Sequence, residues 1–206
     1  MNPKLINYIE EEVIPRYKAF DKAHNIDHVM QVIQESLLLA KEYGGEEAMC
    51  YAIAAYHDLG LINGRERHHI DSGIILMNDH TLESWFDPNQ LLTMKEAIED
   101  HRASNENPPR SLYGEIVAEA DRCIEPIYTI RRAVQYGLNH HPEKDKDWQY
   151  QRVVQHMEEK YAEGGYLKLF LDKSSNAKNL AELRRIIKDK NQLKSIFDQL
   201  YKEEAF

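Results

Sequence analysis

The sequence predicts an all-α fold, and three observations support this prediction. Apolar residues recur at helical spacing along the chain, and no segment shows the sustained alternation, rich in Val, Ile and Thr, that is typical of a strand. Hydrophobic residues make up 42% of the 206 residues and charged residues 30%, a balance typical of a soluble globular protein. No apolar run approaches the roughly 20 residues that a membrane-spanning helix needs.

Nine helices are expected, separated by residues that break helices. Gly44-Gly45 ends the second helix, Asp87-Pro88 begins the fifth with proline in its first turn, and residues 105–110 form the clearest loop. The expected ranges are 3–14, 26–43, 46–59, 68–78, 88–101, 112–124, 127–140, 147–162 and 177–203.

The chain shows no internal repeat and no convincing domain boundary, so residues 1–206 are expected to form a single helical domain. The last expected helix carries a helical stripe that fits packing in the core or at a dimer interface. Its members are Leu180, Leu183, Ile186, Ile187, Leu193, Ile196, Phe197 and Leu200.

The formal charge of −9 argues against a scaffold for duplex nucleic acid, which usually needs a basic face. An acidic protein that handles phosphates needs local cations, and bound metal is one source of them. Cys50 and Cys123 are expected to be buried, inert thiols, because both lie in apolar helical patterns. The first residues lack the apolar stretch of a secretory signal, so a cytoplasmic protein is expected.

The strongest local signal is His57-Asp58, which follows a very apolar helical segment. An adjacent imidazole and carboxylate at the end of a buried helix are costly unless a partner compensates their polarity, and a divalent metal does so. A helix-terminal pair that bonds orphan carbonyls explains the two residues equally well.

Upstream, His24 and His28 are four residues apart, with Asn25 or Asp27 available to cap the helix. The face of His28 adjoins apolar residues, which favours His28 over His24 as a ligand.

Further ligand-type residues follow on three later helices. His69, beside His68, is followed one turn later by Gly73, which leaves space for close helix approach or for metal and substrate. His101 and Arg102 end an amphipathic helix, and Asp121 lies in an apolar one. Each has an ordinary structural explanation alone, but facing helices that project such ligands inward build dinuclear sites.

The order His28, His57-Asp58, His69, His101 and Asp121 resembles that of the HD superfamily of metal-dependent phosphohydrolases. The resemblance covers about residues 21–125, and residues from about 126 onward would form a C-terminal helical extension. The added histidines His69 and His101 resemble those of family members that bind a second metal. These members include the HD-GYP phosphodiesterases and the symmetrical diadenosine tetraphosphate hydrolases.

The segment around His101 and Asp121, with Glu125-Pro126, is similar to the diadenosine enzymes. However, Arg102-Ala103-Ser104 stands where those enzymes have Thr-Thr-Gly, and the chain lacks the Gly-Tyr-Pro stretch of the HD-GYP group.

This resemblance implies an HD-domain-like helical bundle with additional C-terminal helices and one or two divalent ions of iron, manganese, zinc, nickel or magnesium. It implies a first metal held by His28, His57, Asp58 and Asp121, with Asp58 bridging to a second metal held by His69 and His101. The residues expected to act in catalysis are Asp58, His69, His101 and Arg102. Arg65, Arg67, His68 and, less strongly, Arg110 are further candidates for phosphate contact.

The expected activity is hydrolysis of a phosphomonoester or phosphodiester by a metal-activated water. The expected partner is a small phosphorylated substrate such as a nucleotide, with no membrane and no duplex nucleic acid; the sequence leaves a homodimer open. Two alternatives remain at this point: a diiron oxygenase on the same scaffold, and a non-catalytic regulatory module that binds metal. The complete ligand set counts against the second alternative.

Overall fold

The computed structural model describes residues 1–20 and 24–205, and every regular element in this part of the chain is helical. The all-α prediction is therefore confirmed. The chain divides into two compact units, Met1–Arg122 (unit 1) and Cys123–Phe206 (unit 2), where the sequence led us to expect a single domain. The division falls close to the expected start of the C-terminal extension. The first residues of the motif region, from about Asp21, lie partly outside the described residues.

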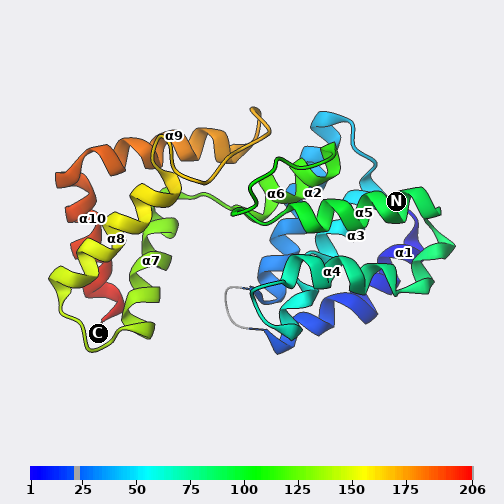
Figure 1. The fold of residues 1–206 in the computed structure, drawn as a ribbon, viewed down its shortest axis with the longest axis horizontal. Helices are drawn as coiled ribbons and strands as arrows, with labels where there is room; N and C mark the ends of the chain where they lie inside the picture. The colour runs from blue at the N-terminus through cyan, green and yellow to red at the C-terminus, as the bar shows by residue number, and fades with distance from the viewer. Residues whose placement is uncertain (21–23, 206) are drawn as a thin grey trace. The chain divides into compact units, whose positions relative to one another are not determined.

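Unit 1 is built from six α-helices joined by short helical turns (Figure 1). The α-helices are α1 Pro3–Tyr8, α2 Ile26–Tyr43, α3 Glu47–Tyr56, α4 His68–Met77, α5 Pro88–Asp100 and α6 Leu112–Asp121. The turns are the π-helical η1 Ile9–Val13 and the 3-10 turns η2 Ile14–Ala19, η4 Leu59–Asn63 and η5 His80–Ser84.

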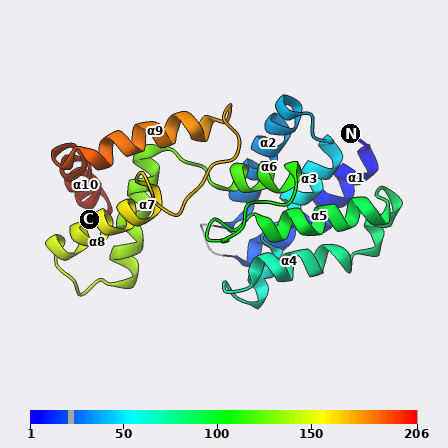
Figure 2. The same cartoon turned by 45° about the horizontal axis from the view of Figure 1, so that its top comes forward.

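Helix α3 is the centre of unit 1. It lies among α2, α4, α5 and α6, as two views show (Figures 1 and 2), and every residue from Met49 to Tyr56 is buried. A helix that is apolar on all sides must be enclosed by others, and this explains why its sequence lacks an amphipathic pattern. The end of α3 therefore lies in the interior of the unit.

Unit 2 contains four helices that pack on one another: α7 Pro126–His140, α8 Lys146–Tyr161, α9 Ser175–Lys188 and α10 Lys190–Glu204. Leu183 and Phe197 of the predicted stripe are fully buried there, so the stripe forms the core of this unit. None of the helices in the described part of the chain is long and apolar enough to cross a membrane.

Two predicted helices are interrupted. The first is α-helical only to Tyr8 and becomes a 3-10 turn at Ile14, because Pro15 has no amide N–H to continue the helical pairing. The last breaks at Asp189, whose backbone is extended (φ −88°, ψ 92°). Its carboxylate accepts hydrogen bonds from the N–H groups of Asn191 and Gln192, and so begins a new helix.

Candidate metal centre

The His57-Asp58 pair lies where α3 ends. His57 still has helical dihedral angles, whereas Asp58 leaves the helix with φ −111° and ψ 3°. Nδ1 of His57 lies 2.7 Å from the carbonyl oxygen of Ala54, so this nitrogen carries the proton and donates it. Nε2 therefore presents a lone pair to the interior of unit 1.

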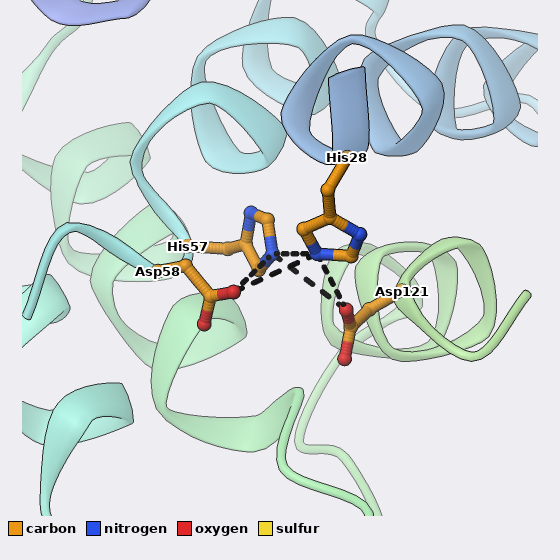
Figure 3. Close-up of side chains that lie close together, drawn as sticks. All are labelled: His28, His57, Asp58 and Asp121. Carbon is orange, nitrogen blue, oxygen red and sulfur yellow. Dashed lines mark hydrogen bonds and ion pairs between the residues drawn. The ribbon is translucent and has the colours of Figure 1, made fainter. Parts of the chain in front are cut away.

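Four side chains from three helices meet at this point: His28 of α2, Asp121 of α6 and the His57-Asp58 pair (Figure 3). They are the four residues that the resemblance to the HD superfamily implies as ligands of a first metal. Nε2 of His57 lies 3.2 Å from Oδ2 of Asp58 and 3.3 Å from Nε2 of His28. Oδ1 of Asp121 lies 3.2 Å from Nε2 of His28 and 3.7 Å from Nε2 of His57.

The chemistry of this first cluster fits a divalent metal. In the metal-binding tautomer, lone pairs of two imidazoles and two carboxylates face one another, an arrangement that is repulsive without a cation between them. Ligand atoms around a tetrahedral ion with bonds of about 2.0–2.2 Å are about 3.3–3.6 Å apart. The separations of 3.2–3.7 Å between atoms of the cluster match that spacing.

A second cluster shares Asp58. Its other oxygen, Oδ1, lies 3.5 Å from Nε2 of His68 and 3.6 Å from Nε2 of His101. These two nitrogens are 3.3 Å apart, and each ring places Nδ1 by a backbone oxygen, that of Arg65 for His68 and Ile98 for His101. The backbone contacts fix both rings with Nε2 turned toward the carboxylate. With three protein ligands, the second cluster leaves positions for water or substrate.

The structure brings His68, and not the predicted His69, into the second cluster. Both stand in the first turn of α4, but successive residues of a helix point about 100° apart, so only one of the two rings can face Asp58. The ring of His69 lies beside that of His68, with centroids 5.5 Å apart. Its Nδ1 is buried without a hydrogen-bond partner among the described residues, and burial with the nearby His101 lowers the pKa of His69 to about 4.

Gly73 supports helix packing instead of opening space for metal. A Cβ at Gly73 would come 3.1 Å from a side-chain carbon of Lys95 on α5, so this glycine permits α4 and α5 to approach. The closer approach is at Gly60, where a Cβ would lie 2.1 Å from the carbonyl oxygen of His68. The N–H of Gly60 also donates to Ser72 of α4 at 2.8 Å. These contacts hold the start of α4, and with it His68, against the His57-Asp58 turn.

The carboxylates and imidazoles of the first cluster shift one another's ionisation. Burial opposes charge on Asp58 and Asp121, but the surrounding histidines outweigh it and hold the pKa of both carboxyls well below the usual range. Burial likewise opposes protonation of His57, yet the two carboxylates raise its pKa well above the ordinary value. A bound cation would take the place of that proton.

The ligands of the first cluster differ in their exposure to solvent. The side chains of His28 and Asp121 are 14% and 27% exposed, whereas those of His57 and Asp58 are at most 4% exposed. His24 lies beside the more exposed His28, with ring centroids 5.9 Å apart. The first cluster is therefore less buried at His28 of α2 and Asp121 of α6 than at the His57-Asp58 turn.

The predicted phosphate-binding arginines differ in their surroundings. Nη1 of Arg102 donates to the carbonyl oxygen of Glu66 at 2.6 Å, which places it at the loop before α4, while Arg65 and Arg67 are exposed in that loop. Arg110 instead forms ion pairs with three carboxylates of α5, including Asp100 at 2.9 Å and Glu99 at 2.8 Å. Arg110 therefore fastens its loop to α5.

The fold and the paired clusters define an all-helical protein with histidine–aspartate groups suited to hold metal ions. Residues 25–125 match the HD domain family, and further helices follow this region. The fold is similar to the crystal structure of a protein described as a predicted HD superfamily hydrolase, from an uncultured Thermotogales bacterium. That match has a TM-score of 0.50 and 19% identity, and it covers 74% of this chain and 82% of the other. The search of curated proteins found no match.

Proposed function

We propose that this chain is a metal-dependent phosphohydrolase that acts on a small nucleotide or a related phosphate ester. The observation that carries the proposal is the shared carboxylate of Asp58, whose two oxygens face different ligand clusters. Such pairs of adjacent metal sites are characteristic of enzymes that transfer or hydrolyse phosphoryl groups. The HD domain and the hydrolase description of the structural neighbour point in the same direction.

Divalent ions, when bound, would polarise the phosphate oxygens and lower the pKa of a water molecule beside them. Residues of the chain would position the ions and bind the phosphate. Asp58 holds the two clusters at a fixed separation, and His101 is aimed by its contact with the carbonyl of Ile98. Arg102, which donates to the carbonyl oxygen of Glu66 in the loop before α4, would donate to a phosphate oxygen of the substrate.

His69 has a different role in this proposal from the one that the sequence indicated. Its ring lies beside His68 but outside both ligand clusters. We place it next to the substrate, as a neutral hydrogen-bonding group.

The test is a screen of the purified chain, loaded in turn with manganese, iron, zinc, nickel and magnesium, against nucleoside mono-, di- and triphosphates and simple phosphodiesters. We expect phosphate or nucleoside release with at least one metal, lost in His28→Ala and retained in Arg110→Lys. Arg110 provides the matched control because its charge is engaged by α5.

Metal bound at full occupancy without release from any of these compounds would overturn the proposal. Oxygen consumption by the iron-loaded chain in their place would point to an oxygenase.

A further inference from the structure

Tyr17 is a buried residue that belongs to neither ligand cluster, yet its side chain contacts the backbone at the His57-Asp58 turn. It lies on η2, two residues after Pro15, and its side chain is fully buried. Its ring stands 6.4 Å from the ring of His57, with Phe20 edge-on at 5.5 Å. Nothing in the sequence pattern of the metal ligands includes this residue.

The phenol of Tyr17 bridges two backbone groups at the end of α3. Its hydroxyl donates to the carbonyl oxygen of Ala55 at 3.0 Å and accepts from the N–H of Asp58 at 3.3 Å. The last carbonyls of a helix lack donors within the helix and must find them elsewhere. Here the carbonyl of Ala54 is bonded by the ring of His57, and that of Ala55 by Tyr17.

Because Tyr17 accepts from the N–H of Asp58, this hydrogen bond holds the backbone at the point where Asp58 leaves the helix. The orientation matters more for Asp58 than for any other ligand, because its two oxygens must face different clusters at once. Oδ2 lies 3.2 Å from His57, and Oδ1 lies 3.5 Å from His68. A small rotation of the backbone at Asp58 would move one oxygen out of its cluster.

We infer that Tyr17 is a positioning residue that sets the bridging orientation of Asp58 through the backbone of the His57-Asp58 turn. As a neutral phenol, the hydroxyl can donate to Ala55 and accept from Asp58 at the same time. Tyr17 contacts the backbone of the turn and belongs to neither ligand cluster. The inference rests on the proposed function only for its kinetic readout.

The chain offers a matched control in Tyr56, a second fully buried tyrosine. It immediately precedes His57, but its hydroxyl donates to the carboxylate of Asp79 at 2.5 Å and makes no contact with the turn. Tyr17→Phe and Tyr56→Phe each remove one buried hydroxyl and leave the ring in place. A general loss of stability should therefore affect both variants, whereas loss of positioning should affect Tyr17→Phe alone.

The experiment measures manganese binding by the full chain, with the thermal midpoint recorded for each variant. Outer-shell partners of metal ligands typically change metal affinity by about 10–100-fold. We expect Tyr17→Phe to weaken binding of the second Mn²⁺ by about that factor and to reduce the spin coupling between the two ions in electron paramagnetic resonance spectra. Tyr56→Phe should retain wild-type affinity and coupling. If a substrate is known, Tyr17→Phe should lower kcat and leave KM nearly unchanged.

Wild-type affinity and coupling in Tyr17→Phe would overturn the inference, and so would equal losses in both variants. A wild-type chain that binds only one Mn²⁺ would also overturn it, because no bridging carboxylate would then exist. Failure to hydrolyse any phosphate would count against the proposed function alone, since the metal measurements do not depend on a substrate.

Discussion

The two units of this chain are both helical, yet they bury different polar groups. Among the described residues, every histidine, aspartate and glutamate that is less than about a tenth exposed lies in unit 1, namely His57, Asp58, His68, His101 and Glu119. The polar side chains buried in unit 2 are neutral: Thr129, Gln149, Ser174 and Asn176. The amide of Gln149 donates to the carbonyls of Gly137 and His141, and the oxygen of Asn176 accepts from the N–H of Ile124.

The buried polar groups of the two units differ in the partners that they face. In unit 2 the amides of Gln149 and Asn176 bond to backbone groups, which stabilises the fold. In unit 1 the ligand-type groups face one another, which costs free energy unless a cation joins them. Unit 1 has 11 Lys and Arg against 22 Asp and Glu, a charge of −11, whereas unit 2 has 15 against 13, a charge of +2. The more acidic unit is thus the one with the metal centre.

The largest effect should come from Asp58→Ala, which removes a ligand from both clusters. We expect loss of metal from both sites and a fall in hydrolysis on the order of 10³-fold, because several kcal/mol of electrostatic stabilisation depend on the metals. The fall should exceed that of His69→Ala. Elemental analysis and rates at saturating metal provide the measurement. Equal residual rates in the two variants would indicate that Asp58 does not bridge.

A cavity created by mutation in unit 2 tests whether metal binding in unit 1 depends on the stability of unit 2. Phe197 is fully buried, with the rings of Tyr150 and Tyr201 centred 5.2 and 5.5 Å away. Phe197→Ala should cost about 3–5 kcal/mol in the free energy of unfolding of unit 2. Trp148 reports on unit 2 in a Trp85→Phe background, because the chain has one tryptophan in each unit. Metal content should not change; parallel loss of metal would show that the centre needs unit 2.

The two neighbouring histidines of α4 give a smaller and more specific effect. His68→Ala should bind one fewer metal per chain than the wild type, whereas His69→Ala should keep the full number and lose affinity for substrate. The physical reason is that only the ring of His68 reaches the second oxygen of Asp58. Elemental analysis under metal-replete conditions distinguishes the variants. The reverse result, with the metal lost in His69→Ala, would return His69 to the ligand set.

Much of this arrangement could be predicted from the sequence, because ligand-type residues in apolar helices are conspicuous. Periodicity and an estimate of burial marked His28, His57-Asp58, His101 and Asp121 as candidates, and the resemblance to the HD superfamily joined them into one ligand set. The choice between His68 and His69 could not be made in this way, because it depends on the angle at which α4 begins. That angle is set by the contact of Gly60 with the carbonyl of His68, which joins residues eight apart and leaves no periodic pattern.

Tyr17 could not be found for a related reason. Its contribution is a hydrogen bond from a short 3-10 turn to the backbone of residues about 40 positions away. Backbone acceptors carry no residue signature, so no spacing of side chains points to such a contact. The division into units was also hidden, because the polypeptide between α6 and α7 contains no long run of glycine, proline or serine.

The smallest expected effect concerns a histidine of unit 2 that lacks the carboxylates of the metal centre. His156 lies on α8 with its ring edge-on to Tyr161, and burial, with the positive charges of Lys160 and Arg152, lowers its pKa to about 4. In the unfolded chain the pKa of histidine is about 6.5. As pH falls from about 6.5 to about 4, the unfolded state therefore binds a proton that the folded state does not.

Unit 2 should lose stability over this window, by at most about 1.4 kcal/mol per pH unit from this one group. The direction is opposite to that of His57, whose raised pKa favours the protonated folded form. Urea unfolding followed by Trp148, fitted with separate baselines at each pH, gives the slope. His156→Phe keeps a ring against Tyr161 and should be less sensitive to acid than the wild type by this amount. Identical pH slopes in the two proteins would show that His156 is accessible enough to titrate normally in the folded state.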